Sequence, residues 1–167
     1  MYKKTSVLTF SALLVASYIA VMFLTQGFAF GPYQVRIATA FYSLSYLFPF
    51  LVIPLALANS LSNVLMGGLG PLDIIGGFLV GLVTGFLVYL VRRWKLPAVL
   101  TIFPVIFGPG LIVPLWLSPI TGIPYWALVL SLCLGQVTPA IVGYILIRAL
   151  QKIRGTRPDA PFSRLMD

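Results

Sequence analysis

The chain has 167 residues, of which 60% are hydrophobic and 8% are charged, and its mean hydropathy is +1.05. A soluble domain of this length carries about a quarter charged residues, so the composition excludes a water-soluble fold. The net charge of +8 gathers at three points along the chain instead of forming a continuous basic stripe, which argues against nucleic-acid binding. A lipid bilayer accepts apolar side chains on every face of a helix, so the composition indicates an integral membrane protein.

Proline and glycine residues divide the chain into six apolar segments. The second and third segments are too short for a straight crossing, so we expect tilted or broken helices there, buried or lining a cavity. We therefore predict an all-α integral membrane protein with six transmembrane helices, comprising a membrane domain over residues 1–154 and a polar cytoplasmic tail over 155–167. The segments cover residues 6–27, 37–50, 53–67, 73–92, 98–117 and 125–150.

Basic residues occur in three clusters, at Lys3 and Lys4, at residues 92–95 and at residues 148–157. Four predicted segments separate the first two clusters and two separate the last two, so all three clusters lie on the same side of the membrane. The positive-inside rule places that side in the cytoplasm. We therefore expect cytoplasmic N and C termini in a multi-pass protein of the cell membrane.

Arg36 and Asp73 are the only charged side chains between Thr5 and Val91. A charge within a membrane segment costs about 2.5–3.5 kcal/mol on insertion scales, which makes each a candidate functional residue. Each also has a structural explanation, because Asp73 could cap a helix and Arg36 could extend to lipid phosphate. Both are predicted near the outward side with Gln34 close by, so we favour a ligand site there.

Three amide side chains lie within apolar segments. Asn59 and Asn63 are four residues apart and therefore share one helical face, and Gln136 lies in the last segment. They either join helices by hydrogen bonds, at about 0.6 kcal/mol each, or form the wall of a polar pocket. An aromatic belt is predicted toward the outward side, and one or two of its members could stack on a planar ligand. These aromatic residues are Tyr33, Tyr42, Tyr46, Trp116, Tyr125 and Trp126.

Small residues repeat every four positions in two segments, which allows helices to approach closely. The sequence alone leaves open whether they pack within this bundle or against another subunit. The repeats are Ala12, Ala16 and Ala20 in the first segment, and Gly77, Gly81 and Gly85 in the fourth.

Several chemistries are excluded by composition. The chain has no histidine and a single cysteine, Cys133, so it offers no Ser-His or Cys-His pair, no disulfide and no cysteine metal site. Asp73 is the only carboxylate side chain before the tail. The glycines at 67–70 lack the Lys-Ser/Thr of a phosphate-binding loop, so ATP would have to be used by a partner. We predict that the chain is not an enzyme and binds neither a cofactor nor a metal.

Three stretches resemble the queuosine-precursor transporter (QueT) family. Residues 31–37, Gly-Pro-Tyr-Gln-Val-Arg-Ile, resemble its Q-x-R-I signature, and Ala58-Asn59 and residues 70–76 are similar to its other motifs. The family often carries an acidic residue shortly after the Arg-Ile pair, where this chain has Ala38-Thr39-Ala40.

The resemblance implies the substrate-binding S component of an energy-coupling factor (ECF) transporter, which works with a transmembrane coupling protein and two cytoplasmic ATPases. It implies that Ala12, Ala16 and Ala20 dock the coupling protein. The ligand implied is queuine or another 7-deazaguanine, whose N1–H and exocyclic amine a carboxylate such as Asp73 can accept together.

We therefore expect an outward substrate site built from polar and charged side chains. Alternatives from the sequence are an S component for another vitamin-like nutrient, or an oligomeric channel with a ring of Asp73 or Arg36 at its mouth. The expected substrate-binding residues are Gln34, Arg36, Asn59, Asp73 and Gln136.

Overall fold

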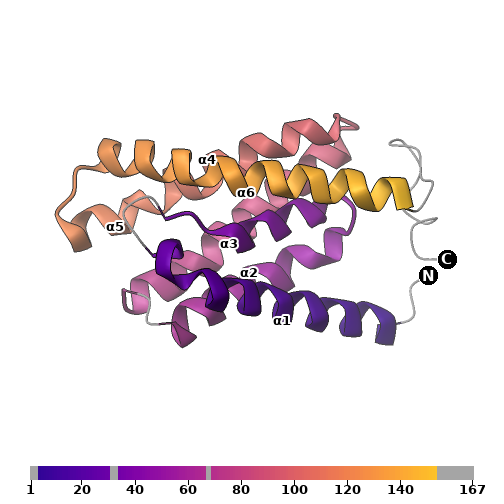
Figure 1. Ribbon diagram of the computed structural model, residues 1–167, viewed down its shortest axis with the longest axis horizontal. Helices are drawn as coiled ribbons and strands as arrows, with labels where there is room; N and C mark the ends of the chain where they lie inside the picture. The colour runs from indigo at the N-terminus through magenta and orange to yellow at the C-terminus, as the bar shows by residue number, and fades with distance from the viewer. Residues whose placement is uncertain (1–3, 31–33, 67–68, 154–167) are drawn as a thin grey trace.

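A computed structural model describes residues 4–30, 34–66 and 69–153, and every regular element within these ranges is a helix (Figure 1). Four stretches are long and apolar enough to cross a membrane, at Thr5–Ala29, Pro71–Arg93, Ala98–Thr121 and Tyr125–Ile153. They match the predicted first, fourth, fifth and sixth segments. The elements in chain order are α1 (Lys4–Ala29), η1 (Ile37–Tyr46), η2 (Pro49–Leu51), α2 (Val52–Leu65), α3 (Pro71–Arg93), η3 (Ala98–Thr101), α4 (Ile102–Ile112), α5 (Pro114–Thr121) and α6 (Tyr125–Ile153).

The predicted second and third segments form an irregular pair inside the bundle. η1 is a ten-residue 3₁₀ helix with eight buried residues, although such helices rarely exceed three or four residues. It begins next to Arg36 and ends at Tyr46, whose hydroxyl donates to the Leu96 carbonyl at 3.0 Å in the turn after α3. The chain then returns through η2 and α2. The structure thus confirms the all-helical fold and the irregular helix, while six crossings remain a prediction.

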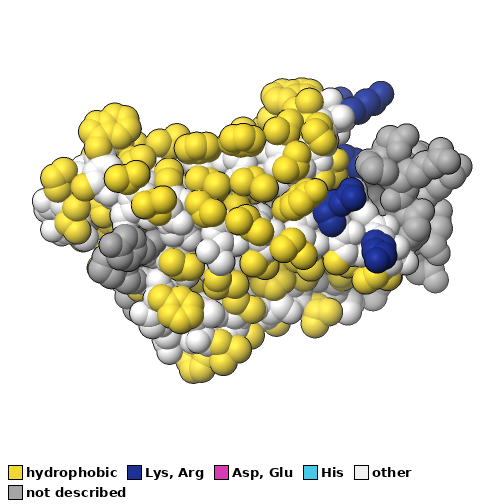
Figure 2. All heavy atoms as spheres, turned by 45° about the horizontal axis from the view of Figure 1, so that its top comes forward, with side chains coloured by type: hydrophobic (Ala, Val, Ile, Leu, Met, Phe, Trp, Pro, Cys, Tyr) yellow, Lys and Arg dark blue, Asp and Glu magenta, His cyan; other side chains and the backbone are white. Residues whose placement is uncertain are grey.

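Apart from Arg36, the basic residues of the described ranges lie at one end of the bundle. α1 begins there, and α3 and α6 end there (Figure 1). Lysine and arginine side chains gather at the same end of the face shown in Figure 2, and hydrophobic side chains cover most of the rest. This end is called the basic end below. The start of α1 and the described basic residues at 92–95 and 148–153 share this end, as the predicted topology requires. Its cytoplasmic assignment remains a prediction, and Lys3 and the predicted tail lie outside the described residues.

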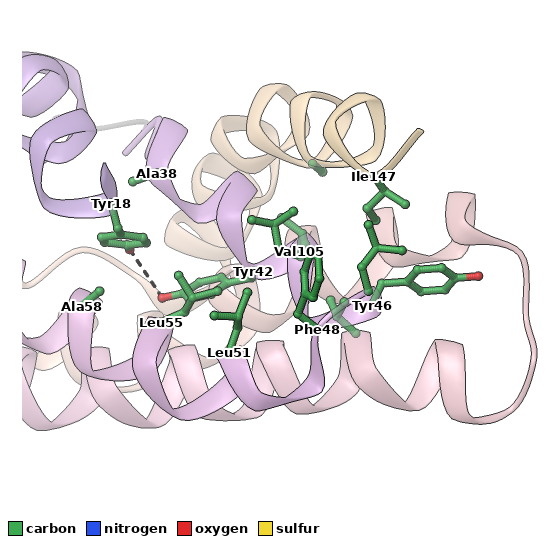
Figure 3. Packing of buried hydrophobic residues seen from close by; sticks show 14 of the residues in the cluster. Tyr18, Ala38, Tyr42, Tyr46, Phe48, Leu51, Leu55, Ala58, Val105 and Ile147 are labelled. Atoms are coloured by element: carbon green, nitrogen blue, oxygen red, sulfur yellow. Dashed lines mark hydrogen bonds between the residues drawn. The ribbon is translucent and has the colours of Figure 1, made fainter. Parts of the chain in front are cut away.

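A hydrophobic core surrounds η1 (Figure 3). The hydroxyl groups of Tyr18 on α1 and Tyr42 on η1 lie 3.5 Å apart within it, and both side chains are fully buried. Tyr42 therefore belongs to the core, and Tyr46 lies near the basic end with the Arg92 guanidinium 5.4 Å from its ring centre. The prediction of an outward aromatic belt is wrong for these two residues, because both serve to fix η1.

The two small-residue repeats have different surroundings. Gly81 of α3 packs directly on α2, and a Cβ atom there would lie 2.8 Å from the Ala56 Cα atom. The glycine repeat therefore serves close packing within the bundle. Ala12, Ala16 and Ala20 are instead exposed along α1, where no other described helix covers them.

Candidate functional site

The five predicted binding residues line a single cavity, away from the basic end of the bundle. The cavity has a volume of about 10 Å³, which is room for about one water molecule. Side chains from the segment before η1 and from η1, α2, α3, α4, α5 and α6 surround it. The lining residues are Gln34, Arg36, Thr39, Asn59, Asp73, Gly77, Val80, Pro109, Val113, Trp116, Leu132 and Gln136.

The Arg36 guanidinium is held in place by two asparagines of α2. Its Nη1 donates to Asn59 Oδ1 at 3.1 Å and its Nη2 donates to Asn63 Oδ1 at 3.2 Å. Its Nε donates to the Ala29 carbonyl at the end of α1 at 3.4 Å, and the Phe30 ring lies 4.9 Å from Cζ. These bonds engage three of its five N–H groups among the described residues. Arg36 is 8% exposed, so it does not extend to the lipid headgroups.

The same two asparagines connect α2 to α3. Asn59 Nδ2 donates to the Gly77 carbonyl at 2.8 Å, and Asn63 Nδ2 donates to the Asp73 carbonyl at 2.9 Å. Their spacing of four residues places both amides on one helical face, as predicted. Each amide accepts from Arg36 and donates to α3, so the guanidinium is fixed relative to the start of α3.

Asp73 lies in the first turn of α3, where a negative charge is favoured by the helix dipole. Its Oδ2 accepts from the Leu69 backbone N–H at 3.4 Å, and its Oδ1 accepts from the Trp116 indole N–H at 3.1 Å. The N-cap residue of α3 is Gly70, so Asp73 is not the N-cap. Its carboxylate nevertheless accepts a hydrogen bond from the Leu69 N–H just before the helix. The predicted capping role of Asp73 is therefore correct in part.

Trp116 closes the cavity from α5. Its indole ring packs on the α3 backbone at Gly76, where a Cβ atom would come within 2.6 Å of the ring. The indole is half-buried and donates its N–H to a cavity carboxylate. The sequence grouped Trp116 with five other aromatic residues as a belt in which one or two members could stack on a ligand, because composition does not distinguish a belt residue from one that points inward.

Gln136 of α6 fixes the segment that carries Arg36. Its Oε1 lies 2.7 Å from the Thr39 hydroxyl, and its Nε2 donates to the Gln34 carbonyl at 3.4 Å. The Thr39 hydroxyl also lies 2.7 Å from the Arg36 carbonyl and has one proton to donate, so it serves one of the two acceptors at a time. Gln34 has a φ of 41°, a left-handed conformation that turns the chain into η1. Thr39 was not predicted to line the cavity, because the sequence does not distinguish it from threonines that bond only within their own helix.

The site contains a buried cation and a buried anion that do not pair with each other. Arg36 is 8% exposed and Asp73 is 6% exposed, and no ion pair joins them in the described structure. Asn63 connects them indirectly through the Asp73 backbone carbonyl. Buried charges in proteins are ordinarily paired, so this arrangement suits a polar guest that contacts both.

A model of the QueT transporter family matches residues 8–152 of the chain. No curated protein and no solved structure matches the chain.

Proposed function

The chain belongs to the QueT transporter family, and from this we propose that it is the S component of an ECF transporter that captures queuine or another 7-deazaguanine. Membership in a transporter family makes it a membrane transport protein for a queuosine precursor, not an enzyme. The four long apolar helices agree with a place in the membrane.

One observation carries the proposal about the site. Arg36 and Asp73 are buried against the same cavity, and each holds its charge without the other as partner. A 7-deazaguanine offers complementary groups on its pyrimidine edge. Its N1–H and exocyclic amine can donate to the Asp73 carboxylate, and its carbonyl can accept from Arg36 or an amide. Unpaired polar groups in a dry site cost about 1–3 kcal/mol each, which would disfavour molecules lacking these groups.

We infer that Trp116 occupies the place of the ligand in the described state. The cavity of about 10 Å³ is too small for a two-ring heterocycle. The indole presents an aromatic N–H to Asp73 Oδ1 at 3.1 Å, which is the interaction the ligand N1–H would make. Binding therefore requires Trp116 to move away from Asp73, and the ligand N–H groups replace the indole N–H.

The exposed alanines of α1 support the proposed partner. Ala12, Ala16 and Ala20 form an uncovered stripe of small residues, and only 17% of the apolar stretch of α1 is buried, against 39–44% for the other three long helices. Such a stripe allows the close approach of a helix from another subunit. We propose that the coupling protein docks there, with two cytoplasmic ATPases supplying ATP hydrolysis.

The burial of both charges argues against the channel alternative. A ring of Asp73 or Arg36 at a channel mouth requires side chains that several subunits share. Both side chains instead lie inside one chain, bonded to groups of that chain.

Binding to the purified chain tests the proposal. Isothermal titration in detergent should show saturable binding of queuine and 7-deazaguanine but not of thiamine, riboflavin or biotin. D73A and R36A should abolish it, and T138A, at an exposed position on α6, should bind normally. Binding of a vitamin instead would refute the substrate class. Unchanged binding by D73A and R36A would refute the site.

A further inference from the structure

An apolar groove runs along the outside of the bundle between α3 and α4, apart from the site described above. Its volume is about 470 Å³. Leu87 and Trp94 lie along its α3 side, and Phe103, Phe107 and Leu111 lie along its α4 side. These side chains are 40–65% exposed, so the groove opens away from the core.

The groove follows the helix axes. Phe103 and Leu111 are eight residues apart on α4, which corresponds to about 12 Å along the axis. The rings of Phe103 and Phe107 stack at 6.4 Å with an interplanar angle of 8°, so they form one smooth wall. The groove is apolar and runs along the helices, so it suits a hydrocarbon chain lying parallel to them.

Cations flank the end of the groove that lies at the basic end of the bundle. Trp94 lines the groove there, and the neighbouring Arg93 and Lys95 are exposed. The turn that follows α3 holds them in place, because Lys95 donates its N–H to the Arg92 carbonyl and Leu96 donates to the Val91 carbonyl, both at 2.9 Å. Tryptophan at such a position is typical of the membrane interface.

No carboxylate neutralises these cations within the described ranges. Asp73 is the only acidic residue in 4–30, 34–66 and 69–153, and it is buried in the cavity at the start of α3. An apolar groove that ends beside cations which no described carboxylate neutralises is complementary to a molecule with a long apolar chain and a negative head.

We propose that this groove binds an anionic phospholipid, with one acyl chain between α3 and α4 and the phosphate-bearing headgroup against Arg93 and Lys95. Each basic residue near a membrane surface contributes an attraction that corresponds to about fivefold enrichment. Two such residues give about 5- to 30-fold enrichment of the anionic lipid over a zwitterionic one in the groove.

Brominated lipids test the site, because bromine quenches tryptophan fluorescence at contact. The chain carrying Trp94 as its only tryptophan (W116F and W126F) is reconstituted into phosphatidylcholine vesicles with a small fraction of brominated phosphatidylglycerol or brominated phosphatidylcholine. At equal fractions, the brominated phosphatidylglycerol should quench Trp94 several-fold more strongly. The chain with only Trp126, on α6 at the far end from the basic residues, should show equal quenching by the two lipids.

Charge variants distinguish binding of the anionic lipid at Arg93 and Lys95 from a general attraction of anionic lipid to the protein. R93Q with K95Q in the Trp94-only chain should remove the preference, whereas K152Q, exposed in the last turn of α6, should retain it. Added salt should weaken the preference in the Trp94-only chain with its basic residues intact, which provides a second test if the double variant fails to fold. Equal quenching of Trp94 by both lipids, or a preference that survives loss of Arg93 and Lys95, overturns the proposal. Absence of quenching by either lipid also overturns it, because another protein surface would then cover the groove.

Discussion

Arg36 and Asp73 lie against the same cavity without forming an ion pair, and Asn63 bridges them by accepting from Arg36 at 3.2 Å and donating to the Asp73 carbonyl at 2.9 Å. The bridge fixes Arg36 relative to the Asp73 backbone, and among the described residues the Asp73 carboxylate accepts from the N–H groups of Leu69 and Trp116. A direct ion pair would have consumed the groups that a ligand needs. The arrangement therefore supports the proposed ligand site.

The geometry of the guanidinium should matter beyond its charge. Lysine at position 36 keeps the charge but cannot bond to Asn59 and Asn63 through a planar fork, so R36K leaves buried amide oxygens without a donor. We expect a lower thermal unfolding midpoint and about 5- to 100-fold weaker ligand binding. Calorimetry and thermal unfolding in one detergent measure both. R148K, exposed on α6, is the control, and R36K matching it in both measurements would show that the fork is unimportant.

Removing the indole N–H should favour the ligand. W116F keeps an aromatic ring against Gly76 but no longer donates to Asp73, so the ligand no longer competes with an internal donor. We expect binding to tighten about 2- to 10-fold and association to accelerate, because a net hydrogen bond contributes about 0.5–1.5 kcal/mol. Stopped-flow binding measures the rate. Weaker binding by W116F would show that the indole N–H contacts the ligand itself.

Close packing of α3 on α2 should depend on Gly81. A methyl group there meets the Ala56 backbone at 2.8 Å, which cannot move independently, so G81A should destabilise the bundle by about 1–3 kcal/mol. G27A is the matched control, because nothing lies within 4 Å of a Cβ atom at that position and alanine favours helix. Thermal unfolding should give a lower midpoint for G81A and an unchanged or higher one for G27A. Equal midpoints would contradict the assigned packing.

The exposed alanine stripe of α1 should be needed for assembly with the proposed coupling protein but not for ligand binding. A16L enlarges a side chain that faces away from the core, so ligand affinity of the isolated chain should stay within error. Co-purification with the proposed coupling protein and ATP-dependent uptake should fall sharply. A149L makes the same change at an exposed position on α6 and should leave both intact. Normal assembly by A16L would place the docking surface elsewhere.

The sequence predicted those cavity residues whose charged or polar side chains cost free energy in a membrane segment. Arg36 and Asp73 are conspicuous because few forces other than function or a strong structural need keep a charge there. The spacing of Asn59 and Asn63 predicted that they share one helical face. Asn59 lines the cavity, and Asn63 holds Arg36 without lining it. Trp116 and Thr39 were not identified as cavity residues, because aromatic and hydroxyl side chains are common throughout membrane helices and their direction depends on tertiary packing.

The fold was predictable from apolar segment length except where the backbone departs from the α-helix. The four long segments match helices because each supplies enough apolar residues for a crossing. Proline positions indicated breaks near residues 49 and 54, but composition does not distinguish a buried 3₁₀ helix such as η1 from a short α-helix. Its form is set by packing against α1, α3 and α6.

The hydrogen bond proposed between the exocyclic amine of the ligand and Asp73 can be tested by removing either partner. The affinities of 7-deazaguanine and of 7-deazahypoxanthine, which lacks the exocyclic amine, are measured by titration for the unmodified chain and for D73N. We expect the unmodified chain to prefer 7-deazaguanine by about 10-fold or more, and D73N to lose most of this preference. Equal affinities for the unmodified chain, or a full preference retained by D73N, would contradict it.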